Sequence, residues 1–236
     1  MVETHSERAR RLFAPLGPSY DRYARLLSLR QDPCWRRFLV SRLPVGPDDV
    51  VLDAATGTAA VALELVRQTG CSVVGVDQSP EMLEEARRRL AAAGTARVRL
   101  VEASAAELPV EDASFDGLTA AYLLRYLDDL PAGLHELARV LRPGATAAAL
   151  DFGVPRARVP RTAWNLYVDL GLPLLGRAVS PGWYEVGRFL GASIREFDAG
   201  YPLPRLLGLW REAGFEDVRA RRLSLGGCFV VWGRRA

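Results

Sequence analysis

The sequence contains no lysine, and all 31 of its basic residues are arginine. A P-loop phosphotransferase is therefore excluded, because its phosphate-binding lysine has no counterpart. The chain has only two histidines, His5 and His135, so a metal site built on histidine is not expected. Its three cysteines, Cys34, Cys71 and Cys228, form no C-x-x-C pair. That usage argues against a zinc site or a disulfide framework and fits a reducing compartment.

Long hydrophobic runs and a strong net charge are also absent. No uninterrupted apolar stretch reaches the roughly 18 residues of a membrane-spanning helix, and residues 1–7 are polar, without the apolar core of a signal peptide. We therefore expect a cytoplasmic protein. The net charge of +3 is too small to indicate nucleic-acid binding, but it is compatible with weak attraction to an anionic membrane surface. With 236 residues, 49% of them hydrophobic, one α/β domain over 1–236 is expected.

The stretch 50–58 is the most informative part of the chain. A short apolar run leads to Asp53, followed by small residues up to Gly57 and then by a helical pattern. This order is typical of a buried parallel strand, a tight turn and the start of a helix, which is where open α/β sheets bind ligands. A second acid, Asp77, ends the next apolar run twenty residues after Gly57. At that spacing, nucleotide-binding folds offer a carboxylate to ribose hydroxyls. The alternative is a plain βαβ unit with a surface aspartate.

Alternating strand and helix patterns predict a mainly parallel sheet with helices on both faces. Ser79 as N-cap, Pro80 in the first turn and Gly94 at the end delimit one helix clearly. The predicted strands are 50–54, 72–76, 97–101, 115–120 and 145–151, and the predicted helices are 59–68, 79–94, 130–141 and 205–214. Two last strands, 215–220 and 227–232, are joined so closely that an antiparallel hairpin at the sheet edge is expected.

Two segments fall outside this alternation. Residues 1–47 are mostly helical in pattern and form a cap before the first strand, and residues 155–204 are rich in aromatics and leucine. This insertion leaves the carboxyl end of a strand, so it can lie above the ligand crevice. It is interpreted either as extra helices packed on the sheet edge or as an apolar lid over a hydrophobic substrate.

Other enzyme classes with this architecture match poorly. A nicotinamide dehydrogenase needs G-x-G-x-x-G, whereas the turn holds only Gly57 among Ala55, Ala59 and Ala60. The G-x-S-x-G elbow of α/β hydrolases is absent.

An acid-x-small-x-Gly-x-small turn after the first strand, with an acid ending the second, resembles the class I S-adenosylmethionine-dependent methyltransferases. The segments that carry this resemblance are 51–58, 74–83, 107–109, 114–116, 124–125 and 139–144. Three further pieces resemble one branch, the ubiquinone/menaquinone biosynthesis C-methyltransferases, over nearly the whole chain: 20–21 with 35–37 in the cap, 189–197 in the insertion, and 214–215 with 226–227 near the end.

The resemblance implies a Rossmann-like fold with a mainly parallel seven-stranded sheet and an antiparallel C-terminal hairpin. It implies S-adenosylmethionine as cofactor, with Asp77 accepting the ribose hydroxyls and the turn at 55–58 lying beside the methionyl end. The cofactor-binding residues it implies are Asp53, Ala55, Thr56, Gly57, Thr58, Asp77, Gln78, Met82, Ser104 and Ala105.

The resemblance also implies an acceptor, a polyprenyl quinol with demethylmenaquinol first, methylated on a ring carbon. It places Arg125 and Tyr20 beside that ring as catalytic residues, Arg125 stabilising phenolate charge, and Tyr126, Trp183 and Phe189 at the substrate. The alternative for Arg125 is a surface salt bridge, and for Tyr20 it is core packing. A lipid-soluble substrate implies docking at the inner face of the membrane. A homo-oligomer is left open, and no nucleic-acid partner is expected.

The chain departs from the family pattern at four positions. Ala59 and Ala60 stand for Gly and Asp, Ser104 stands for Asp or Asn, and Tyr126 replaces the Asn beside the catalytic Arg. The change at Tyr126 keeps a second acceptor class open, another phenolic or apolar small molecule. A non-catalytic protein that keeps the fold as a partner for other proteins is the third hypothesis.

Overall fold

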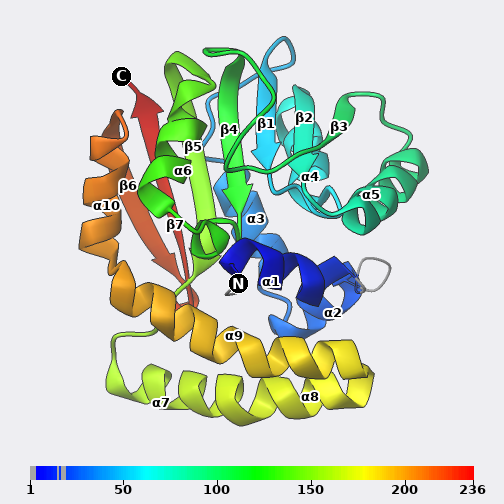
Figure 1. Ribbon diagram of the computed structural model, residues 1–236, viewed down its shortest axis with the longest axis vertical. Helices are drawn as coiled ribbons and strands as arrows, with labels where there is room; N and C mark the ends of the chain where they lie inside the picture. Colours follow the sequence, from blue (N-terminus) through cyan, green and yellow to red (C-terminus); the bar gives the residue numbers. More distant parts are fainter. Residues whose placement is uncertain (1–3, 15, 17–19) are drawn as a thin grey trace.

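The computed structural model describes residues 4–14, 16 and 20–236. Its centre is a seven-stranded sheet of order β3-β2-β1-β4-β5-β7-β6 (Figure 1). The strands are β1 (Val50–Ala54), β2 (Ser72–Asp77), β3 (Val98–Glu102), β4 (Phe115–Ala121), β5 (Leu141–Phe152), β6 (Phe215–Leu223) and β7 (Cys228–Arg235). β1 to β5 pair in parallel, and β7 is antiparallel to both β5 and β6. The predicted fold, including the C-terminal hairpin, is confirmed.

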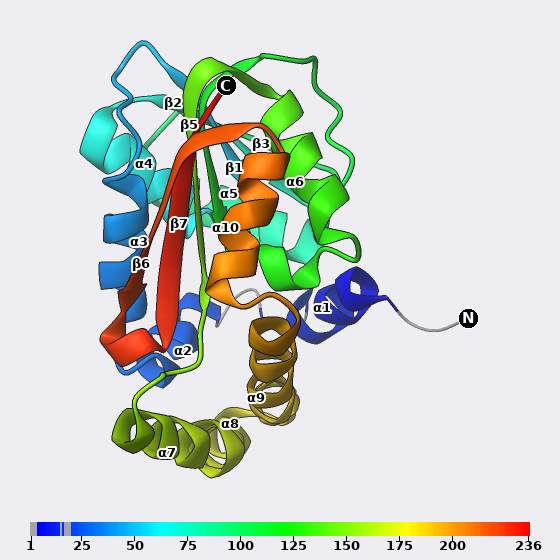
Figure 2. The same cartoon turned by 90° about the vertical axis from the view of Figure 1, so that its left-hand side faces the viewer.

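Helices cover both faces of the sheet (Figure 2). One hydrophobic cluster joins the sheet to α6 and α10, and a second joins the opposite face to α3, α4 and α5. The helices are α1 (His5–Phe13), α2 (Tyr20–Leu27), α3 (Asp32–Val40), α4 (Ala60–Thr69), α5 (Pro80–Ala93), α6 (Leu130–Arg139), α7 (Arg158–Leu166), α8 (Leu172–Val179), α9 (Pro181–Gly200) and α10 (Leu203–Glu212). Short turns η2 (Leu124–Tyr126), η3 (Tyr167–Gly171) and η4 (Ser224–Gly226) complete the set.

The local signals in the sequence place most of these elements correctly. Ser79 accepts the Met82 N–H as N-cap of α5, and Gly94 closes that helix in the left-handed conformation. β5 is longer than predicted and begins at Leu141. Leu141 pairs with Phe115, and a register shift lies between that pair and the pairing of Gly117 with Thr146, so strand pairing starts before the predicted beginning at residue 145.

A third layer lies across the carboxyl ends of β1 and β4 (Figure 1). It consists of α1 and α2 with α7, η3, α8 and α9, and the chain from Arg158 to Val179 is continuous helix with a π-helical turn at η3. These helices share their own hydrophobic cluster, formed by Leu16, Leu27, Val168, Leu172, Trp183 and Val186. Residues 155–204 therefore pack on the N-terminal helices above the strand ends. Among the residues described, no helix is both long and apolar enough to span a bilayer.

Candidate active site

The turn after β1 is held from behind by Asp53. The Asp53 side chain is only 1% exposed, and its two oxygens accept hydrogen bonds from the hydroxyls of Thr56 (2.6 Å) and Thr119 (2.7 Å). Ala55, Gly57 and Ala59 all have positive φ angles, so the backbone reverses direction tightly before α4. Burial raises the pKa of Asp53 to about 6, against the lowering effect of the two hydroxyls.

Asp77 ends β2 beside this turn. One carboxylate oxygen accepts the Gly57 N–H at 2.8 Å and the other accepts the Ser79 N–H at 2.9 Å. Burial raises the pKa of Asp77, and those N–H groups act in the opposite direction. An ionised carboxylate has about four acceptor positions, and the backbone N–H of Gln78 also acts on it, so Asp77 keeps acceptor capacity for a ligand while it orders the turn.

A cavity of about 380 Å³ opens along the carboxyl ends of β1, β2 and β4. Nine of the ten predicted cofactor residues line it: Ala55, Thr56, Gly57, Thr58, Asp77, Gln78, Met82, Ser104 and Ala105. The tenth, Asp53, is not in the lining, since its carboxylate faces Thr56 and Thr119. Its place indicates that it shapes the turn from behind. The residues present suit S-adenosylmethionine, because they combine a ribose acceptor, a close backbone turn and small residues beyond β3.

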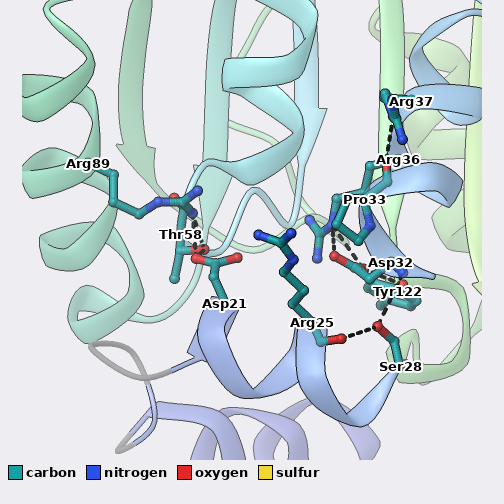
Figure 3. A network of polar contacts seen from close by, with 10 residues as sticks. All are labelled: Asp21, Arg25, Ser28, Asp32, Pro33, Arg36, Arg37, Thr58, Arg89 and Tyr122. Atoms are coloured by element: carbon teal, nitrogen blue, oxygen red, sulfur yellow. Dashed lines mark hydrogen bonds and ion pairs between the residues drawn. The ribbon is translucent and has the colours of Figure 1, made fainter. Parts of the chain in front are cut away.

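Helix α2 is tied to the same turn by polar contacts. Asp21 of α2 accepts from the Thr58 hydroxyl at 2.6 Å and pairs with Arg89 of α5 (Figure 3). Arg89 also donates to the Thr58 carbonyl at 2.7 Å. Asp21 thus contacts the turn after β1 directly.

A second polar centre follows β4. Arg125 of η2 is 6% exposed and forms an ion pair with Asp151, a carboxylate at the end of β5 that is fully buried. Its Nη2 donates to the Tyr126 hydroxyl at 2.9 Å, and its guanidinium lies 4.4 Å from the centre of the Tyr126 ring. Its buried Nε has no hydrogen-bond partner in the described structure. Arg125 is therefore not a surface salt bridge.

An apolar cavity of about 210 Å³ adjoins the first. Phe13, Tyr20, Tyr122 and Arg125 line both cavities and form the wall between them. The apolar cavity is otherwise lined mainly by α2, α3, α7, η3 and α9. The two predicted catalytic residues thus lie at the junction of a polar and an apolar cavity.

The predicted substrate residues are distributed around this junction. Tyr126 lines the first cavity and Trp183 the second, where the indole stacks on Tyr20 with ring centres 6.0 Å apart. Phe189 lines neither cavity, but it stacks on Tyr126 at 6.3 Å. Its role in the structure is to support the Tyr126 ring.

Sequence reasoning missed Phe13 and Tyr122 in the wall between the cavities, and Asp32 and Arg36 beside it. Asp32 and Arg36 pair in the first two turns of α3, and the Tyr122 hydroxyl donates to Asp32 at 2.7 Å. In the sequence, Asp32-Pro33 is typical of an ordinary helix start. Nothing in the pattern signals that this start packs against the end of β4.

The raised pKa of Asp53 predicts a specific pH dependence of stability. The folded state binds the proton more tightly than the unfolded chain, whose carboxyl has a pKa of 3.8, so this contribution is full below that value and is lost as the pH rises through about 6. Between about pH 4.5 and pH 7.5 we expect it to fall by about 2 kcal/mol. Urea unfolding of Asp53→Asn and of the parent across that range should show the difference in slope, and parallel curves would contradict it.

Comparisons with known proteins agree with this geometry. Residues 1–235 match the model of the ubiE/COQ5 methyltransferase family. A Geobacter protein named ubiquinone/menaquinone biosynthesis C-methyltransferase UbiE is 37% identical over 96% of this chain and 95% of its own. A Thermus thermophilus protein named demethylmenaquinone methyltransferase is 37% identical over 95% of this chain and 100% of its own.

Solved structures share the fold at lower identity. A SAM-dependent methyltransferase from Aquifex aeolicus superposes with a TM-score of 0.59 at 19% identity, covering 85% of this chain and 89% of that one. A geranyl diphosphate methyltransferase in complex with GPP and sinefungin gives 0.61 at 18% identity, covering 86% and 77%. The fold, the predicted cofactor residues that line the first cavity and the match over nearly the whole length lead to one conclusion: the chain belongs to the ubiE/COQ5 family of S-adenosylmethionine-dependent methyltransferases.

Proposed function

We propose that this protein methylates a ring carbon of a polyprenyl quinol, with demethylmenaquinol as the first candidate. The observation that carries the proposal is the junction at Tyr20 and Arg125, where a cavity lined by cofactor residues meets an apolar cavity. A reaction between a polar cofactor and a hydrophobic ring needs both environments within reach of one another. The relatives named above are called quinone methyltransferases, which supports the same substrate class.

Each group of residues has its own role in the proposed reaction. Bound S-adenosylmethionine supplies an electrophilic methyl group on its sulfonium. Asp77 and the turn at Ala55–Thr58 orient that group toward the junction. Arg125 stabilises the phenolate that makes the ring carbon nucleophilic, because its guanidinium keeps its charge in the site. Burial raises the pKa of Tyr20, so this hydroxyl stays protonated and orients the ring. Apolar side chains of the second cavity exclude water from the reaction.

Tyr126 favours a second candidate, another phenolic acceptor. Its hydroxyl accepts one of the Arg125 donors, and its ring covers the guanidinium. Both contacts reduce the space beside Arg125, which would suit a smaller ring than a naphthoquinol.

Methylation assays on reduced lipid acceptors test the function. Purified protein with S-adenosylmethionine should convert demethylmenaquinol in lipid vesicles to a product one methyl group heavier, measured by mass spectrometry of the lipid extract. Methylation of soluble phenols without the quinol would favour the second candidate. Binding of S-adenosylhomocysteine without product from either acceptor class would support a non-catalytic partner protein.

The end of the molecule that carries the apolar cavity supports docking on a membrane. All the large hydrophobic side chains exposed in the described structure belong to α2, the α2–α3 turn, α7, η3, α8 and η4, which lie at one end (Figures 1 and 2). They are Leu26, Leu29, Val159, Leu166, Leu170, Leu174, Leu175 and Leu225. The continuous helix from 158 to 179 has three arginines and one aspartate. Anionic lipid is the occupant that matches this pairing of exposed leucine with positive charge.

Vesicle binding tests this surface. We expect the protein to sediment with anionic phosphatidylglycerol vesicles, and Leu166→Gln with Leu170→Gln to weaken binding at least about tenfold, since burying a leucine side chain yields about 1.5–3 kcal/mol. Arg158→Gln with Arg161→Gln should weaken binding mainly to anionic vesicles and reduce its salt dependence. Equal binding by the parent and the leucine variant would contradict the proposal, and dimers that separate only in the leucine variant would assign the face to a second copy.

A further inference from the structure

Tyr122 is held in an unusual backbone conformation at the wall between the two cavities. It follows β4 directly and has a φ of 60°, a region that non-glycine residues adopt rarely and at a cost. Its N–H donates to the Leu150 carbonyl at 2.7 Å, and its ring stacks on Phe152 with centres 4.7 Å apart. These contacts fix the side chain so that it lines both cavities. Strain of this kind at a site is a signal of function rather than of packing alone.

The Tyr122 hydroxyl is connected to a buried carboxylate. It donates to Asp32 Oδ1 at 2.7 Å, while Arg36 Nε lies 2.9 and 2.8 Å from the two Asp32 oxygens (Figure 3). Asp32 and Arg36 are 7% and 8% exposed. Among the described residues, Asp32 is the one carboxylate in the lining of the apolar cavity. The only hydrogen bond described for the Tyr122 oxygen is the one it donates, so both of its acceptor positions remain for a ligand.

We propose that Tyr122 and Asp32 accept the proton from the ring hydroxyl of the methyl acceptor. The O–H bond of the acceptor breaks, its proton passes to the Tyr122 oxygen, and the proton of Tyr122 passes to an Asp32 oxygen. The acceptor becomes a phenolate, Asp32 becomes a neutral acid, and Tyr122 is unchanged. After methyl transfer, the ring C–H proton leaves to water and Asp32 returns its proton through Tyr122 to the ring oxygen. This inference rests on the proposed function, since it requires an acceptor that carries a hydroxyl.

The other polar groups of the wall suit this role less well. Arg125 cannot accept a proton at ordinary pH, and the Tyr126 oxygen already accepts from Arg125. Asp151 is paired with Arg125 and lines neither cavity. Tyr20 makes no described hydrogen bond to a carboxylate that could take its proton onward. Among the described residues of the wall, Tyr122 is the one whose hydroxyl donates a hydrogen bond to a carboxylate.

Energetics require Arg125 to act together with the pair. Moving a proton from a phenol to a free carboxylate is uphill by about six pKa units. A phenolate beside the Arg125 guanidinium is stabilised as it forms, and the transfer then needs much less. Burial, together with Asp32, raises the pKa of Tyr122, against the effect of Arg36. Tyr122 therefore passes the proton on without persisting as a phenolate. The other titratable groups that face Tyr122 are the buried Cys228 thiol and Arg125, whose guanidinium lies 5.8 Å from the centre of the Tyr122 ring.

Tyr122→Phe tests the proposal with little disturbance, because it keeps the ring stacked on Phe152. We expect kcat to fall at least about 100-fold, the scale of general base catalysis, with KM and the affinity for S-adenosylhomocysteine within about threefold of the parent. Asp32→Asn serves as a second variant, with unfolding measured in parallel because Arg36 would lose its partner. Tyr23→Phe is the matched control. Tyr23 lies on α2 outside both cavity linings and packs against Trp183. Removing its hydroxyl should therefore leave kcat unchanged.

The acidity of the methyl acceptor's hydroxyl distinguishes two roles of Tyr122, proton transfer and a purely structural contact. With a series of ring-substituted acceptors, the rate of Tyr122→Phe should rise steeply as the acceptor's hydroxyl becomes more acidic and as the pH is raised, whereas the parent should respond weakly. A variant that keeps more than about a third of the parent's kcat, or one that loses activity equally on every acceptor, would overturn the proposal. If the parent is active and Tyr122→Phe is equally active, the proton transfer through Tyr122 and Asp32 is refuted, but the proposed function is not. A parent that methylates no hydroxyl-bearing ring refutes the proposed function as well.

Discussion

Asp77→Ala is expected to bind S-adenosylhomocysteine at least about 100-fold more weakly than the parent. The Asp77 carboxylate would accept hydrogen bonds from both ribose hydroxyls, and bonds to a charged group contribute about 1.5–3 kcal/mol each. The substitution also frees the N–H groups of Gly57 and Ser79, so the turn beside the cofactor loses its orientation. Calorimetric titration of the purified variant measures the loss directly.

Glu102→Ala is the matched control for this substitution. Glu102 ends β3 and is paired in register with Asp77, but its side chain is exposed and lies outside the cavity lining. It should bind the ligand as the parent does, and both variants should unfold cooperatively. Unchanged affinity in a folded Asp77→Ala protein would show that the cofactor lies elsewhere in the cavity.

Local rules account for the parts of the site that the sequence predicted. Asp53, Gly57 and Asp77 lie at the ends of neighbouring parallel strands, and a parallel sheet brings such positions together whatever the rest of the chain does. The meeting of the predicted cofactor residues in one cavity therefore follows from strand order and spacing. The same reasoning could not predict that the Asp53 side chain faces away from the cavity. Successive side chains of a strand point to opposite sides, so a difference of one residue decides the direction.

The wall between the two cavities depends on contacts between distant segments. Asp32 and Tyr122 are ninety residues apart in the chain, and only the packing of α3 against the end of β4 brings them together. The positive φ of Tyr122 leaves no trace in composition or periodicity, since tyrosine has no preference for that region. Arg125 was predicted through a family resemblance, and its pairing with Asp151 was not. Ionic pairs buried between strand ends are specified by the tertiary fold, beyond the reach of local pattern.

Arg125→Met is expected to abolish methyl transfer while the cofactor still binds. The variant keeps a side chain of similar length, but it removes the guanidinium that pairs with Asp151 and donates to Tyr126. Losing a donor to a developing oxyanion costs about 100- to 1,000-fold in kcat. The change also leaves Asp151 buried without its partner, which destabilises a protein by about 3–5 kcal/mol. Burial already raises the pKa of Asp151, so without the guanidinium this carboxyl should take up a proton.

A second variant separates the loss of catalysis from the loss of stability. Arg125→Met combined with Asp151→Asn removes both charges, so the free energy of unfolding should return toward that of the parent while kcat stays low. Arg125→Lys keeps the charge but not the planar fork that reaches Asp151 and Tyr126 together, and it should recover stability better than activity. Titration with S-adenosylhomocysteine confirms in each case that the first cavity is intact. If the double variant regained activity along with stability, Arg125 would be a structural residue, and the stabilisation of the phenolate would have to come from elsewhere in the wall.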